Sequence, residues 1–224
     1  MGNFRVSRAA NLDYFMSVLT SDTITKMSGG RIPKMTKEQA SGLVGSWIVE
    51  TGNPKLENLD VIEKGAAAGR GLSQYTDGAR PGRRTAYEIK RAEAVKKGVD
   101  PNSPQFQLRH FVDEYAGKLD RLVGGKSLIG WTRVFERAPK SGTPGQYAQY
   151  YTGSAASGKG YFRPSVPHTD KRMDAANQVF NIYKNVNLSQ PGSTVFQPET
   201  TPRQFVQNIL NLNPNTGANP WAMK

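Results

Sequence analysis

The chain has 224 residues, no cysteine and a formal net charge of +12, from 30 Lys and Arg against 18 Asp and Glu. The missing thiols exclude disulfides, thiolate catalysis and cysteine-based metal sites, and two histidines make a histidine-rich metal site a poor expectation. We therefore expect no metal and no cofactor, and without a run of about 18 apolar residues we expect no membrane span. The positive charge favours an anionic partner, either DNA or a cell wall.

The predicted elements begin with a short helix over residues 11–19, where apolar side chains recur at helical spacing. A Gly-Gly loop at 28–33 follows. The clearest helix begins at a capping box, Thr36 to Gln39, continues with apolar positions at helical spacing, and ends before Gly52, a residue suited to a C-cap.

Residues 53–82 are expected to form a loop, and so is the Gly-, Ser- and Tyr-rich segment 138–167. The remaining helices are expected at 83–97, 104–123, 128–135, 169–183 and 201–210. Alternating strand patterns are nearly absent. The predicted fold class is mostly α, with room for a small hairpin in the loops.

Glu50 lies in the last turn of the clearest predicted helix. At about 100° per residue it is roughly 20° from Leu43 and 60° from Trp47 around the helix, so it borders the apolar stripe. The negative end of the helix dipole also disfavours a carboxylate there. Both effects raise the pKa, as a general acid in glycoside cleavage requires. A glutamate at a helix end can also simply face water.

Three motifs follow one another from this position. They are Glu-Thr-Gly-Asn-Pro at 50–54, Gly-Leu-Ser-Gln-Tyr-Thr at 71–76 and Arg-Arg at 83–84. In order and spacing they resemble the goose-type lysozyme and lytic transglycosylase superfamily, and more closely the phage tail lysozyme family. Weaker similarities are Gln107-Leu108 with Glu114, and Phe162-Arg163-Pro164 followed by Arg172.

The resemblance covers roughly residues 36–184 and implies a lysozyme-like helical domain over that range. We expect residues 1–35 to form an N-terminal arm with a short helix. Residues 185–224 are expected to form a C-terminal extension that makes assembly contacts. The segment 138–161 is longer than the family pattern requires, and it is a second candidate for such contacts.

The resemblance implies that Glu50 is the catalytic acid and base. The substrate-binding residues it implies are Gly71, Leu72, Gln74, Tyr75 and Arg163. Glycines let backbone approach a ligand, a Gln amide can bond an N-acetyl group, and a Tyr can stack on a sugar. We expect Glu50, Gln74 and Tyr75 to line one cleft, with Tyr147, Tyr150 or Arg163 opposite. At most one fixed cation is expected near Glu50, because a tight Lys or Arg contact would lower its pKa.

A glycoside hydrolase usually needs a second carboxylate, and the candidates are Asp60, Glu63 and Asp77. Each is also well explained as a solvated loop charge. Family members of the transglycosylase kind work with one glutamate and form a 1,6-anhydro product. The sequence leaves hydrolysis and transglycosylation both open.

The predicted function is a phage virion enzyme, made in the host cytoplasm, that cleaves peptidoglycan glycan strands at the host wall to assist DNA entry. Its partners would be the glycan strands, tail or internal-core virion proteins and, non-specifically, DNA. One alternative is a structural virion protein that keeps the fold without activity. Another is a basic DNA-contacting ejection protein, although no nucleic-acid module is recognised in the sequence.

Overall fold

A computed structural model describes residues 5–63, 68–78, 80–129, 133–153, 160–162, 164 and 168–188. The chain divides into two compact units, 1–186 and 187–224. Nearly all of the second unit, with the helix predicted at 201–210, lies outside the described residues. The predicted domain boundaries at 36 and 184 stay predictions, and every described helix belongs to the first unit.

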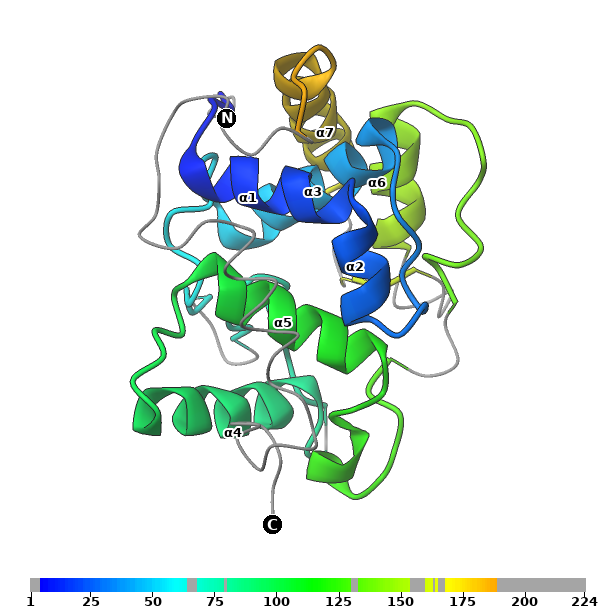
Figure 1. The fold of residues 1–224 in the computed structure, drawn as a ribbon. Coiled ribbons are helices and arrows are strands. Elements are labelled where there is room, and N and C mark those ends of the chain that lie inside the picture. The colour runs from blue at the N-terminus through cyan, green and yellow to red at the C-terminus, as the bar shows by residue number, and fades with distance from the viewer. Residues whose placement is uncertain are drawn as a thin grey trace. The chain divides into compact units, whose positions relative to one another are not determined.

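The described part of the first unit is helical, which confirms the predicted fold class (Figure 1). Its elements are α1 (Ala10–Leu19), α2 (Asp22–Met27), α3 (Lys37–Thr51), α4 (Arg83–Lys96), α5 (Pro104–Tyr115), η1 (Asp120–Val123, a 3-10 helix), α6 (Pro144–Thr152) and α7 (Thr169–Tyr183). Isolated antiparallel bridges join Ile62 to Arg70 and Arg70 to Tyr75 in the loop before α4. Among the described helices, none is long and apolar enough to cross a membrane.

Helix α3 is the centre of the fold and packs against α1, α6 and α7. It begins with the predicted capping box, in which Thr36 and Gln39 each accept a backbone hydrogen bond from the other, and it ends at Gly52 with φ +64°. Two glycines let its neighbours come close. A Cβ on Gly42 would lie 2.6 Å from Tyr147 Cβ of α6, and one on Gly45 would lie 2.4 Å from Ala176 N of α7.

Helix α5 packs against α4 on one side and against α1 and α2 on the other, as Figure 1 shows. Its start follows the predicted signals, because Ser103 accepts a hydrogen bond from Phe106 N and Pro104 occupies the first turn. Helices α3 and α5 meet through Trp47 and Phe111, whose ring centroids are 5.2 Å apart.

The structure differs from the predicted elements in three places. The helix expected over 104–123 stops at Tyr115 because Gly117 has φ +75°, and only the short η1 follows. Residues 134–137, which include the end of the helix expected over 128–135, form turns instead. The loop expected over 138–167 contains α6, which begins with a second capping box between Thr143 and Gln146. Its glycine- and proline-rich surroundings conceal that signal.

Candidate active site

Glu50 lies in the last turn of α3, as predicted, and its side chain is 14% exposed. Burial raises the pKa of its carboxyl, because removing a carboxylate from water disfavours the charged form. The charges of Arg172 and Arg83 act in the opposite direction, and the negative charge of Glu63 adds to the effect of burial. The net effect is a raised pKa, so Glu50 stays protonated to a higher pH than an ordinary glutamate does.

Arg172 of α7 makes the only hydrogen bond that Glu50 accepts within the described residues, from Nη2 to Oε1 at 2.8 Å. Its side chain is 2% exposed, and its guanidinium lies 5.3 Å from the centre of the Phe162 ring. From the sequence, a tight arginine contact is expected to lower the pKa of Glu50 and so remove its proton. The arginine does lower the pKa, but burial outweighs it because only one carboxylate oxygen is engaged.

A second Glu–Arg pair lies close enough for its arginine to act on Glu50. Arg83, at the start of α4, donates from Nε and Nη2 to the two oxygens of Glu114 at 2.6 and 2.9 Å. Tyr161 donates a third hydrogen bond to Glu114. The Arg83 guanidinium lies over the rings of Tyr75 and Tyr161, 5.1 and 4.7 Å from their centres.

The motif at 71–76 is fastened to both α3 and α5. Trp47, one turn before Glu50, donates from Nε1 to Ser73 Oγ at 3.0 Å. Leu72 N donates to Gln107 Oε1 at 2.9 Å. Gly71 has φ +80°, and a Cβ there would lie 2.8 Å from the Tyr87 ring. The glycine is therefore needed for close packing on Tyr87, in place of the close approach to a ligand that its sequence position suggests.

Tyr75 and Leu72 are fully buried and Gln74 nearly so. The Tyr75 ring stacks on Tyr87 at 5.2 Å and meets the edge of His110 at 4.7 Å, which leaves no face for a sugar. Tyr75 is therefore a core residue in this structure. Gln74 adopts φ +44° and donates from Nε2 to Gly71 O at 3.0 Å, while its buried Oε1 has no hydrogen-bond partner among the described residues. A glycan-binding role for Gln74 stays a prediction.

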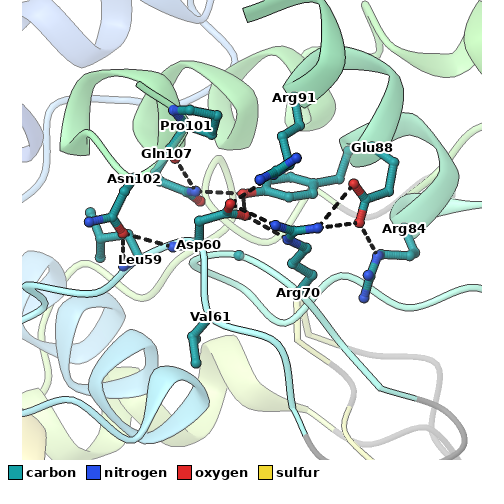
Figure 2. Close-up of polar contacts among 12 residues, drawn as sticks. Leu59, Asp60, Val61, Arg70, Arg84, Glu88, Arg91, Pro101, Asn102 and Gln107 are labelled. Atoms are coloured by element: carbon teal, nitrogen blue, oxygen red, sulfur yellow. Dashed lines mark hydrogen bonds and ion pairs between the residues drawn. The ribbon is translucent and has the colours of Figure 1, made fainter. Parts of the chain in front are cut away.

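The candidate second carboxylate Asp60 is the centre of an ionic network (Figure 2). It accepts hydrogen bonds from Arg70 Nε and Nη2, Arg91 Nε and Tyr87 Oη, all at 2.7–2.8 Å. Burial alone would raise the pKa of Asp60, but these donors outweigh it and lower the pKa. Asp60 fastens the loop to α4, and neither of its oxygens is left for chemistry.

The other two candidates differ from each other. Asp77 caps α4, where it accepts hydrogen bonds from Thr85 N at 3.1 and 3.2 Å and from Thr85 Oγ1. Glu63 is exposed at the end of the loop segment before Gly69, and its charge acts on the pKa of Glu50. Of the three, Glu63 is the carboxylate whose charge contributes to the raised pKa of Glu50.

The tyrosines expected opposite Glu50 make other contacts in the structure. Tyr147 and Tyr150 donate their hydroxyls to the backbone at Pro139 and Arg137. Arg163 lies outside the described residues. The later half of the chain reaches the site through Tyr161, Phe162 and Arg172 instead. Phe162 and Arg172 stand in a motif of the sequence but have no predicted role there, because a buried ion pair between helices leaves no local spacing pattern.

All the segments that carry the resemblance are thus in mutual contact: α3 with the motif at 71–76, the start of α4 with α5, and residues 161–162 with α7. A helical domain that presents a partly buried glutamate at a helix end in this way is lysozyme-like. Residues 22–183 match the family model described as phage tail lysozyme, and the chain belongs to that family. No curated protein and no solved structure matches the chain.

Proposed function

We propose that this lysozyme-like phage protein cleaves the MurNAc–GlcNAc bond of peptidoglycan glycan strands, with Glu50 as the general acid. The supporting observation is the state of Glu50. Glu50 lies in the last turn of the central helix, and its carboxyl keeps some contact with solvent. Burial raises the pKa of this carboxyl although Arg172 acts to lower it. Membership of the phage tail lysozyme family supports peptidoglycan as the substrate.

In the proposed reaction the protonated Glu50 donates its proton to the glycosidic oxygen while the C–O bond breaks, and the bonding electron pair stays on that oxygen. The resulting carboxylate then accepts a proton from the incoming nucleophile. If the nucleophile is water, Glu63 is the candidate second carboxylate. If it is the 6-hydroxyl of the same sugar, the N-acetyl group assists and a 1,6-anhydro end forms.

We further propose that the protein is carried in the virion and opens the host wall for DNA entry. The family to which the chain belongs is one of phage tail lysozymes, and that membership supports this setting. The net charge of +12 suits an anionic wall polymer as well as DNA.

Replacement of Glu50 by Gln tests the proposal. The amide is nearly isosteric but has no proton to donate, so release of fragments from purified sacculi should fall by about 10²–10⁴. The matched control is Glu57→Gln, the same change at an exposed glutamate. Mass spectrometry of the products distinguishes reducing ends from 1,6-anhydro ends.

Activity of Glu50→Gln above about a tenth of wild type would contradict the assignment, given that expected factor. A wild-type protein that releases no fragments would identify a structural virion protein with a lysozyme-like fold.

A further inference from the structure

Glu50 is held from one side by a side chain that cannot itself move freely. Besides donating to Glu50 Oε1, Arg172 donates from Nη1 to the carbonyl oxygen of Ser46 at 3.4 Å, one turn earlier in α3. The guanidinium is packed over Phe162 and is almost fully buried. Its planar fork thus bridges two successive turns of α3, which fixes the direction from which the carboxyl is held.

The distance between Arg172 and Glu50 is set by the crossing of α3 and α7. Ala176 lies one turn after Arg172, and its backbone is in contact with Gly45, which lies just over one turn before Glu50. Because no side chain separates the two helices there, the short arginine–glutamate contact of 2.8 Å is possible. The ion pair is therefore a product of helix packing and not a chance surface contact.

The two oxygens of Glu50 are unequal as a result. Oε1 accepts the hydrogen bond from Arg172, while Oε2 accepts none within the described part of the chain. A proton on Oε1 would have to compete with the arginine donor, so the proton is favoured on Oε2. We propose that Arg172 is a positioning residue that holds Oε1 and so places the transferable proton on Oε2, toward the substrate. This proposal rests on the proposed function.

Among the described residues, the charges that act most strongly on the pKa of Glu50 come from three elements. They are Arg172 from α7, Arg83 from the start of α4 and Glu63 from the loop after α3. Helix α6 has no Asp, Glu, Lys or Arg in its sequence. In α1 the acidic residue is Asp13, which instead accepts hydrogen bonds from Arg8 and Tyr183. Of these described groups, Arg83 still opposes burial and Glu63 once the Arg172 charge is removed.

The test is the pH profile of peptidoglycan cleavage by the full chain carrying Arg172→Gln. Loss of a positive charge this close should raise the pKa of Glu50 further. The alkaline limb of the profile should therefore move to higher pH, by about 1 pH unit or more for an opposite charge in direct contact. Activity at the optimum should fall by about 10- to 100-fold because the carboxyl is no longer held in place.

The matched control is Arg91→Gln, which removes an arginine paired with Asp60 and should leave the alkaline limb in place. Arg172→Lys keeps the charge without the planar fork, so it should keep the limb of the wild type with activity between those of wild type and Arg172→Gln. If Arg172→Gln does not fold, the lysine variant decides, since full wild-type activity there would overturn a positioning role.

A ¹³C NMR titration of the glutamate carboxyls, with Glu50→Gln used to assign the signal, provides a readout that needs no substrate. An active wild type whose Glu50 titration and alkaline limb are both unmoved by Arg172→Gln overturns the role of Arg172. A wild type with no cleavage activity overturns the proposed function, even if the Glu50 signal shifts as expected. The two failures are therefore distinguishable.

Discussion

Glu50 and Glu114 are each paired with an arginine inside the same unit, yet the two pairs have opposite electrostatic outcomes. Glu114 is fully buried and accepts three hydrogen bonds, two from Arg83 and one from Tyr161. Burial alone would raise its pKa, but these partners outweigh burial and lower it. Glu50 accepts a single hydrogen bond from Arg172, and burial prevails.

Asp60 follows the same rule with four donated hydrogen bonds and a lowered pKa. An arginine neighbour therefore does not by itself decide whether a carboxyl is a structural anion or an available acid. The number of donors that reach its oxygens decides, because each donor compensates part of the lost hydration. By this measure Glu50 is the under-satisfied carboxyl of the three.

The largest expected effect of this difference is on stability. Glu114→Gln leaves the buried Arg83 without a counter-charge and should lower the free energy of unfolding by about 3–5 kcal/mol. Glu50→Gln also leaves the buried Arg172 without a carboxylate, but only one hydrogen bond joins that pair and the amide oxygen can still accept it, so we expect a smaller loss of about 1–2 kcal/mol. Urea unfolding of both variants at neutral pH measures the two values. Equal losses would contradict the distinction between the pairs.

A smaller effect extends the comparison to a buried group without any hydrogen-bond partner. Neither ring nitrogen of His110 has a hydrogen bond within the described residues, and burial lowers its pKa to about 4. Between pH 6.5 and 4 the unfolded chain binds a proton at this histidine that the folded chain does not. Stability should therefore fall as the pH drops through this window, by about 3 kcal/mol from His110.

Urea unfolding of the wild type and His110→Phe at several pH values isolates this contribution. The phenylalanine variant should lose that part of the pH dependence, because its ring cannot be protonated. Identical slopes for the wild type and His110→Phe would show that the imidazole is solvated.

The smallest of the three expected effects concerns the Asp60 network. Asp60→Asn keeps the shape but removes the charge that Arg70 and Arg91 share, at a site with some solvent contact. We expect a loss of about 1–3 kcal/mol, typical of hydrogen bonds to charged groups. Peptidoglycan cleavage should persist in the folded fraction. Complete loss of cleavage in a fully folded Asp60→Asn protein would make Asp60 a catalytic carboxylate after all.

Much of the fold is predictable because its signals are local. The capping box at Thr36, the C-cap at Gly52 and the Ser103-Pro104 start of α5 are all decided within a few residues. The early end of α5 escapes prediction because apolar spacing continues past Gly117, where the backbone turns left-handed. Apolar periodicity shows which side chains a segment would bury if it were helical. It does not show that a glycine ends the helix before that pattern does.

The site is predictable only in part. The position of Glu50 at a helix end beside the apolar stripe can be read from spacing. Tyr75 is buried against Arg83, Tyr87 and His110, a packing that no local spacing pattern shows, and its sugar-stacking role stays a prediction. The pairing of Arg172 with Glu50, 122 residues apart, likewise depends on the packing of α7 on α3.

The close contact between Gly45 and Ala176 affects how a substitution at this position would be detected. A methyl group at position 45 touches no sugar and no ionisable group, yet it would push α7 outward and carry Arg172 away from Glu50. Such a substitution would change the pKa of Glu50 while leaving the glutamate itself in place. On the proposed function, a mutational scan that measures wall clearing at one pH would record only a mild loss, whereas one that measures it across pH would reveal a shifted pH profile.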